Sequence, residues 1–427
     1  MMDFISTRNK QLRSSLTEAI RCGLAQDGGL FIPQSIPKIE LSSFTGELSY
    51  PLFAEKVLHA FFKGDILERN LLDICHNAFS FPAPLNQLNE NTYILELFHG
   101  PTLSFKDFGA CFLAACLNQI FTERKTTIMV ATSGDTGSAV ASAFYDKPNV
   151  NVIILYPKGL ISQRQEQQIT CWGNKNIRAL AVNGTFDECQ KLVKSAFTNP
   201  TWNKQFALSS ANSINIGRLL PQIIYYAYSS MQFYQRHSKA PGYVVPTGNL
   251  GNATAGYFAK LMGFPIREIA LATNANKVIE DYLHSGEYQP RTSISTLANA
   301  MDVGNPSNFE RLHYLFNTFD LMKQNISAFS VSDIEISRMI QSVYKQYQYM
   351  ICPHTATAYF VRQQLSPKPW IITATAHPSK FNQIIEPLLN TPIPIPHNLQ
   401  ILLDKPIQVT EVESNLPEIE KVVLSMQ

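Results

Sequence analysis

The sequence predicts an α/β protein built on open, mostly parallel sheets with flanking helices, together with an N-terminal α+β domain. Three observations lead to this prediction. Short apolar strand candidates alternate with helical stretches after about residue 92, which is the βαβ rhythm of parallel sheets covered on both faces. Apolar runs such as 152–155 are continuous, as expected for strands without an exposed face. The residues before 92 instead carry amphipathic helical patterns.

Each predicted element follows from its own pattern. Apolar residues at helical spacing between 52 and 61 predict a helix, and a glycine turn at 27–33 interrupts the N-terminal helical patterns. Further along the chain, apolar runs predict the strands 93–97, 128–131, 150–156, 177–182, 243–245 and 266–273. Helical stretches separate them, so a parallel arrangement is favoured over hairpins.

These elements suggest three regions. We expect an N-terminal domain over 1–92 and a central region over 93–385, in which the smaller of two α/β subdomains spans roughly 105–215. A C-terminal extension covers 386–427, and its proline-rich part, 386–406, predicts an ordinary surface loop.

Composition narrows the class of protein. The 35 basic and 33 acidic residues nearly cancel, so no long-range field favours nucleic acid or an acidic membrane as partner. Seven scattered cysteines without a Cys-x-x-Cys pair predict reduced, mostly buried thiols and no metal site. The chain shows neither a signal peptide nor an apolar run long enough to span a membrane. We expect a cytoplasmic protein that is a monomer or a homodimer.

The segment 99–110 places a lysine in an unusual setting. Lys106 follows a Gly-Pro-Thr turn and precedes an apolar helical run, which would hold it on a rigid corner among apolar neighbours. Desolvation disfavours a charged amine, and a neutral amine is what Schiff-base chemistry needs. A surface lysine beside an ordinary helix start remains an alternative interpretation of this segment alone.

Two glycine loops, each between a strand and a helix, favour the first interpretation. The loop after strand 128–131 brings polar residues to a helix N-terminus, where free N–H groups favour an anion: Thr132, Ser133, Asp135, Thr136 and Gly137. In the loop after 243–245, Gly248 and Gly251 allow the backbone to approach a phosphate closely. Neither loop has a Walker or a Gly-x-Gly-x-x-Gly pattern. With Lys106 they describe one site for an aldehyde cofactor, its phosphate and a carboxylate.

The segments 98–109, 131–139 and 248–252 resemble the threonine synthase family, whose members are pyridoxal-phosphate enzymes of the tryptophan-synthase-β-like fold, or fold type II. Further blocks match outside the site, at 6–8, 19–33, 212–215, 299–302, 353–357 and 375–381. The resemblance runs from about residue 6 to 385 and implies that the N-terminal region is the family's own N-terminal domain. It also implies pyridoxal 5'-phosphate as the cofactor.

The resemblance assigns roles to individual residues. Lys106 would form the Schiff base, and the loop Gly248, Asn249, Leu250, Gly251 and Asn252 would hold the cofactor phosphate. The loop Thr132, Ser133, Gly134, Asp135, Thr136 and Gly137 would grip the substrate, chiefly its α-carboxylate; for Asp135 itself we favour a role in shaping the loop. A second, substrate phosphate would meet Arg218, Asn212 and Asn215. Asn252 stands where many family members carry Asp, and Ser379 replaces a usual Ala.

A hydroxyl partner at the cofactor's pyridine nitrogen leaves that nitrogen closer to neutral than an acid would. The family pattern places Thr375 there, although Thr373 would share its face on a strand. For His354 and His377 we favour structural hydrogen bonding over acid–base roles, and for Arg218 a surface ion pair is the alternative.

The implied function is that of a threonine synthase, a carbon–oxygen lyase acting on phosphates. Such an enzyme converts O-phospho-L-homoserine and water to L-threonine and phosphate by γ-elimination and β-addition of water, the last step of threonine biosynthesis. Alternatives are a related phospholyase or dehydratase acting on a hydroxy or phospho amino acid, and a non-catalytic paralogue that binds the cofactor. The last would be expected to lose Lys106 or a loop glycine, and both are intact.

Overall fold

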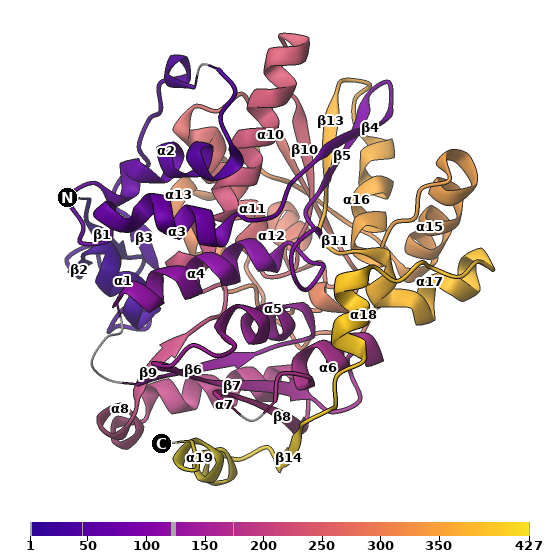
Figure 1. Ribbon diagram of the computed structural model, residues 1–427. Helices are drawn as coiled ribbons and strands as arrows, with labels where there is room; N and C mark the ends of the chain where they lie inside the picture. Colours follow the sequence, from indigo (N-terminus) through magenta and orange to yellow (C-terminus); the bar gives the residue numbers. More distant parts are fainter. Residues whose placement is uncertain (1, 45, 121–124, 174, 427) are drawn as a thin grey trace.

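The computed structural model describes residues 2–44, 46–120, 125–173 and 175–426. Figure 1 shows a larger lobe with helices α10, α11, α15 and α16 and a smaller lobe below it, with helix α4 (Lys106–Ile120) running across the middle. Among the described residues no helix is long and apolar enough to cross a membrane. The predicted α/β architecture is confirmed.

The larger lobe is organised around a six-stranded sheet of order β12-β11-β10-β13-β5-β4. Neighbouring strands are parallel, except that β4 and β5 form an antiparallel pair. The strands are β4 Leu85–Asn89, β5 Thr92–Glu96, β10 Gly242–Pro246, β11 Ile269–Thr273, β12 Ser327–Ser330 and β13 Trp370–Ala374. Because β4 belongs to this sheet, the sheet begins before the predicted domain limit at residue 92.

Alternate residues of the larger sheet pack on opposite layers of helices. Tyr243 and Val245 join the core that includes residues of α10 and α11, whereas Val244 joins the core of α15 and α16. The helices around this sheet are α10 Gln222–His237, α11 Gly251–Met262, α12 Val278–Ser285, α13 Phe309–Phe316, α14 Phe319–Asn325, α15 Asp333–Tyr347 and α16 Pro353–Gln364. Burial on both faces explains why the strands read as continuous apolar runs.

The smaller lobe holds a fully parallel sheet of order β14-β8-β7-β6-β9. Its strands are β6 Thr126–Ala131, β7 Val150–Pro157, β8 Ile177–Asn183, β9 Ala207–Ser210 and β14 Thr410–Glu413. Its helices are α5 Asp135–Phe144, α6 Gln163–Thr170, α7 Phe186–Thr198, α8 Pro200–Gln205 and α19 Leu416–Leu424. Both sheets end their parallel strands toward the region between the lobes, which is where open α/β sheets bind ligands.

The N-terminal residues form a small antiparallel sheet of order β2-β1-β3 (Arg13–Ser14, Phe4–Ser6 and Phe31–Pro33). Three helices accompany it: α1 Leu16–Cys22, α2 Tyr50–Phe62 and α3 Leu71–Ala78. Helix α2 confirms the helix predicted from residues 52 to 61, and its buried side is the apolar stripe that predicted it. This part of the chain is α+β, as expected.

The C-terminal extension connects the two lobes. After α17 (Asn382–Leu389), the proline-rich stretch contains helix α18 (His397–Leu403), so the expected surface loop is corrected. The Gln167 side chain of α6 donates to the carbonyls of Leu402 at 3.4 Å and Lys405 at 2.6 Å, and Asn398 donates to the Gly100 carbonyl at 3.3 Å. The chain then adds β14 to the edge of the smaller sheet, visible in yellow beside β8 in Figure 1.

This arrangement predicts that the last helix stabilises the smaller lobe. Ile419 of α19 is fully buried in the core shared with β6–β8 and α7, so Ile419→Ala should lower the free energy of unfolding by about 2–5 kcal/mol. Leu424→Ala on the same helix is the matched control, because that side chain is 44% exposed and should cost less than about 1 kcal/mol. Urea unfolding of both variants checks this, and equal losses would contradict it.

Candidate active site

A cavity between the lobes receives residues from both sheets. It is lined by Ala131 and Thr132 after β6, by Pro246 and Thr247 at the end of β10, and by Thr375 after β13. Most of the residues predicted to bind cofactor or substrate line it: Lys106, Thr132, Ser133, Asp135, Thr136, Asn212, Arg218, Gly248, Asn249, Leu250, Gly251, Asn252 and Thr375. Five stretches that are far apart in sequence therefore meet at one site, around residues 106, 132–136, 212–218, 248–252 and 375.

The turn before α4 fixes the backbone that carries Lys106. The Asp107 carboxylate accepts hydrogen bonds from the Thr102 N–H at 2.9 Å and the Thr102 hydroxyl at 2.6 Å. The Phe105 N–H donates to the Thr375 carbonyl at 2.8 Å, which anchors the corner to the end of β13. Lys106 is thus the first residue of a buried helix, placed beside Thr375.

The Lys106 amine forms no ion pair with any described residue. Its Nζ lies 4.6 Å from the centroid of the Phe105 ring. Burial lowers the pKa of Lys106 to about 8; the charge of Asp135 opposes this shift, and those of Arg218 and Lys380 add to it. At neutral pH a larger fraction of this amine is unprotonated than in an ordinary lysine, which suits it to attack an aldehyde.

The loop after β6 is shaped by a threonine hydroxyl. The Thr132 Oγ1 accepts hydrogen bonds from the N–H groups of Gly134 at 3.0 Å and Gly137 at 2.8 Å. These two glycines do not line the cavity, and their N–H groups are already used. In the structure these glycines take part in shaping the loop, and their contact with substrate stays a prediction. Thr132, Ser133 and Thr136 remain as the residues that can meet an anion at the start of α5.

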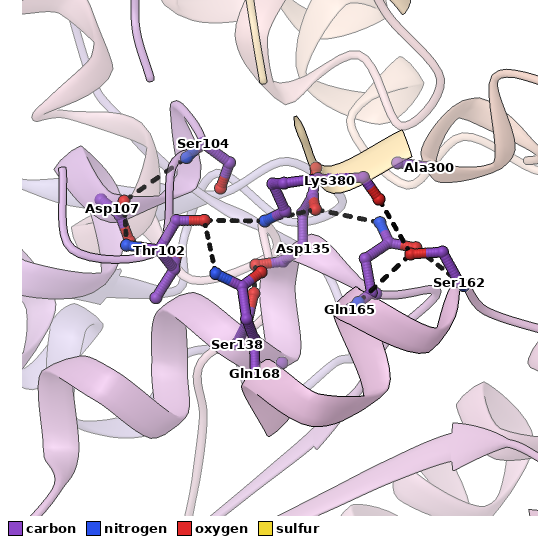
Figure 2. Close-up of polar contacts among 12 residues, drawn as sticks. Thr102, Ser104, Asp107, Asp135, Ser138, Ser162, Gln165, Gln168, Ala300 and Lys380 are labelled. Atoms are coloured by element: carbon purple, nitrogen blue, oxygen red, sulfur yellow. Dashed lines mark hydrogen bonds and ion pairs between the residues drawn. The ribbon is translucent and has the colours of Figure 1, made fainter. Parts of the chain in front are cut away.

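Asp135 is paired with a lysine that the sequence did not single out. The Lys380 Nζ lies 2.8 Å from the Asp135 Oδ1 and also donates to the Thr102 carbonyl at 2.8 Å (Figure 2). Gln165 of α6 donates to the same Oδ1 at 3.0 Å. Burial alone would raise the pKa of Asp135, but the charge of Lys380 holds it below its usual value. The expected loop-shaping role agrees with these contacts.

The loop before α11 has the properties of a phosphate cradle. Leu250 takes a left-handed conformation with φ 59°, and α11, a helix of 12 residues, begins at Gly251. A Cβ at Gly248 would lie 2.7 Å from the Met301 Cα and 2.9 Å from its carbonyl oxygen, so only glycine fits there. The Asn249 side chain is used elsewhere, donating to the Ser213 hydroxyl at 2.7 Å. The loop offers its backbone to an anion.

The contacts of Asn252 show why asparagine can stand at a position where many family members carry aspartate. Its Oδ1 accepts hydrogen bonds from the hydroxyls of Tyr225 at 2.6 Å and Tyr226 at 2.7 Å. Its Nδ2 is buried and has no partner among the described residues. The acceptor is what the fold needs, and an aspartate would supply it equally well. The free Nδ2 fits a cofactor phosphate at this loop.

This arrangement makes a stability prediction. Asn252→Leu would leave the buried Tyr226 hydroxyl without its acceptor, while the Tyr225 hydroxyl would keep the Gln222 Oε1 at 3.0 Å, so the free energy of unfolding should fall by roughly 1–3 kcal/mol. Asn252→Asp keeps the acceptor and should lose about 1 kcal/mol or less. Urea unfolding of the two variants checks the difference. The account of Asn252 would be wrong if the Asp variant were the less stable of the two.

Arg218 is a buried cation without a carboxylate. It lines the cavity with 2% of its surface exposed, it forms no ion pair with a described residue, and its Nε has no hydrogen-bond partner. Burial lowers its pKa to about 10, so it stays charged. The surface ion pair considered from sequence is excluded. Because buried charges are normally paired, a bound anion is the expected partner.

The two asparagines predicted to act beside Arg218 differ in their position relative to the cavity. Asn212 lines the cavity while its Nδ2 donates to the Ala131 carbonyl at 2.8 Å. Asn215 does not line it. The Asn215 Nδ2 donates to the carbonyls of Ile20 and Ser210, both at 2.9 Å, and its Oδ1 accepts from Gly217. Asn215 caps α9 (Ile216–Leu219) and uses its side-chain groups within the protein, and its contact with substrate stays a prediction.

The residues after β13 and at the start of α16 complete the site. Thr375 lines the cavity, whereas Thr373 is fully buried and does not. His377 caps its own turn, accepting from the Ser379 N–H at 3.1 Å, which agrees with a structural role. His354 lines the cavity; its Nε2 accepts from the Ala300 N–H at 3.1 Å, and its Nδ1 has no described partner. Burial lowers the pKa of His354 to about 4, so it is neutral.

Sequence reasoning missed residues that reach the site from other segments. Lys380 and Gln165 act on Asp135, and the cavity is also lined by Ser213, Phe186, Gln190, Gln222, Ala300, Met301 and Val303. The one feature of the sequence that could have indicated Lys380 is its position within the apolar Pro-Ser-Lys-Phe block.

Comparison with known proteins identifies the class. The family model of the pyridoxal-phosphate dependent enzymes matches residues 79–375. The family models of the threonine synthase N terminus and of the threonine synthase C-terminal region match residues 3–79 and 354–423. Solved structures at 13–18% identity, such as a pyridoxal 5'-phosphate-dependent aspartate racemase with a TM-score of 0.52, share the fold. The chain is thus a pyridoxal-phosphate-dependent enzyme of this fold.

Its similarity to threonine synthases covers nearly the whole chain. The Haemophilus influenzae enzyme is 41% identical over 99% of this chain and 100% of its own length. The crystal structure of the Escherichia coli enzyme has a TM-score of 0.94 at 37% identity, covering 100% of both chains. A PLP-bound threonine synthase from Brucella melitensis has a TM-score of 0.93 at 32% identity, covering 100% and 99%. The chain belongs to the threonine synthase family.

Proposed function

We propose that this enzyme converts O-phospho-L-homoserine and water to L-threonine and phosphate, the last step of threonine biosynthesis. One observation carries the proposal: Arg218 and the Lys106 amine, which form no ion pair with any described residue, share a cavity with a separate phosphate cradle. A cofactor phosphate needs only the cradle. Arg218 thus marks a place for a second anion, which a phosphorylated substrate supplies.

The positions of these residues in the cavity support the roles that we propose for them. Pyridoxal phosphate bound through the Lys106 amine would supply the electron sink. The backbone of 248–252 and the Asn252 Nδ2 would hold its phosphate, and the Thr375 hydroxyl would serve as the partner of its pyridine nitrogen. A hydroxyl leaves that nitrogen closer to neutral than a carboxylate would. Thr132, Ser133 and Thr136 at the start of α5 receive the substrate carboxylate, and Arg218 with Asn212 receives the substrate phosphate.

Lys106 also moves the protons. Once the substrate has displaced it, its free amine can take the α-proton and later return a proton at Cγ, because an amine with a pKa near 8 exchanges protons readily at neutral pH. Removal of a proton from Cβ would break the Cγ–O bond and release phosphate. A proton returned at Cγ would then let water add at Cβ, and Cα would regain a proton. Residues of both lobes line the cavity, so closure of the lobes would exclude bulk water during these steps.

We also propose that the enzyme acts in the cytoplasm as a monomer or homodimer. All seven cysteines are free and five of them are buried, which fits a reducing compartment. The near-neutral charge balance gives no reason to expect a nucleic-acid or membrane partner.

A product assay tests the proposed reaction. The purified enzyme is incubated with O-phospho-L-homoserine, and phosphate and threonine are measured together. Equal amounts of the two products are expected. Phosphate accompanied by 2-oxobutyrate would instead assign a phospholyase, and the absence of both products would assign a non-catalytic paralogue.

A further inference from the structure

Two lysines, the partly buried Lys106 and the buried Lys380, lie near one carboxylate at the edge of the active site. Lys380, fully buried on the short helix η4 (Pro378–Phe381), lies 2.8 Å from the Asp135 Oδ1. Lys106 lines the same cavity as Asp135, yet it forms no ion pair with any described residue. The carboxylate is thus paired with the lysine that does not line the cavity.

The pairing is fixed from several sides. Gln165 donates to the same carboxylate oxygen at 3.0 Å, and its own Oε1 accepts from Asn299 at 3.1 Å. The Lys380 Nζ also donates to the Thr102 carbonyl, and its backbone carbonyl accepts from the Ser162 hydroxyl at 3.1 Å. Figure 2 shows Lys380 between Thr102 and Asp135, with Gln165 and Ser162 on the far side of the pair. These contacts hold the Lys380 amine and the Asp135 Oδ1 against each other.

We propose that Lys380 is a positioning residue: by claiming the Asp135 carboxylate, it leaves the Lys106 amine without a counter-ion and so keeps it in its reactive, uncharged form. The inference rests on the proposed role of Lys106 as the lysine that carries the cofactor. A carboxylate left unpaired beside Lys106 would stabilise its ammonium form instead.

The charged groups around Lys106 are few and come from separate elements. Asp107, on α4 itself, is occupied by Thr102. Arg218 of α9 and Lys380 of η4 are cations, His354 of α16 is neutral, and Asp135 of α5 is the anion. The directions agree with the proposal: the charge of Asp135 raises the pKa of Lys106, and that of Lys380 lowers it. Removing Lys380 should therefore raise the pKa of Lys106, and removing Asp135 should lower it.

The test follows how fast the cofactor attaches to the full-length protein. Wild type and variants are freed of cofactor with hydroxylamine and shown by thermal melting to be folded. The return of the visible absorption band on adding pyridoxal phosphate is then timed from about pH 6 to about pH 10, since only the neutral amine reacts. The wild-type midpoint should lie near the Lys106 pKa of about 8.

Lys380→Met should move this midpoint upward and slow attachment at pH 7 roughly tenfold for each pKa unit. Asp135→Asn should move it downward, and the double variant should lie between the two. Lys175→Met is the matched control: Lys175 forms an exposed ion pair with Asp146 at 2.8 Å, and its loss should leave the midpoint unchanged.

The inference is overturned if Lys380→Met leaves the midpoint in place, or if both single variants shift it in the same direction. Should Lys380→Met fail to fold, Lys380→Gln, whose amide can still donate to the Thr102 carbonyl, takes its place and must raise the midpoint. Borohydride reduction of the wild type, followed by peptide mass analysis, separates the two claims. Cofactor on Lys106 with no shift in Lys380→Met refutes only this inference, whereas cofactor on another residue refutes the proposed function.

Discussion

Replacing Lys106 with alanine is expected to abolish covalent cofactor binding and to lower kcat by at least about 10³-fold. The amine lies in the cavity without an ion-pair partner among the described residues, and no other lysine lines that cavity. The variant should lack the visible absorption band of the wild type but should melt at the temperature of the cofactor-free wild type, because the Lys106 side chain forms no ion pair with any described residue. Absorption spectra, steady-state rates and thermal melts check these three points.

Lys175→Ala serves as the control for this experiment, since it removes a lysine from an exposed ion pair away from the cavity. It should keep both the absorption band and the rate. A Lys106→Ala variant that turned over substrate at the wild-type rate would rule out the assigned chemistry.

Gly248→Ala is expected to have the second-largest effect. The added Cβ would lie 2.7 Å from the Met301 Cα and 2.9 Å from its carbonyl oxygen, and a backbone cannot move aside as a flexible side chain can. The loop would have to shift, which should cost about 1–3 kcal/mol of stability. The Kd for pyridoxal phosphate should rise at least about tenfold, because the displaced N–H groups no longer converge on its phosphate. Fluorescence titration and urea unfolding measure the two effects.

Gly251→Ala is the matched comparison in the same loop. Its Cβ would meet side-chain atoms of Asn308 and Ser213 at 3.4 Å, an ordinary contact distance, and its backbone needs no left-handed conformation. This variant should stay within about 1 kcal/mol of the wild type in stability. Wild-type cofactor affinity in Gly248→Ala would show that the loop does not hold the phosphate.

The fold could be predicted wherever local pattern and burial agree. The apolar runs 128–131 and 150–156 correspond to β6 and β7, which are buried on both faces and therefore have one strong signal each. Strand β14 was missed because one of its four residues, Val412, is buried. Its pairing with β8 joins segments more than two hundred residues apart, which no local pattern reports.

For the site too, residues in local motifs could be predicted from the sequence, whereas residues whose role depends on distant contacts could not. Lys106 and Gly248 were predicted because each sits in a local motif whose turn or helix start is itself part of the function. Lys380 could not be predicted, since its role comes from Asp135, which is distant in sequence. The hydrogen bonds of Asn215 to Ile20 and Ser210 could not be predicted either, because they arise from three-dimensional packing.

The position of the covalent attachment tests the account most directly. The enzyme with its cofactor bound is reduced with borohydride and digested, and the peptide that carries the pyridoxyl group is sequenced by mass spectrometry. We expect the label on Lys106 alone. The account would be contradicted by a label on Lys380, the buried lysine that is paired with Asp135. It would also be contradicted if no lysine carried the label.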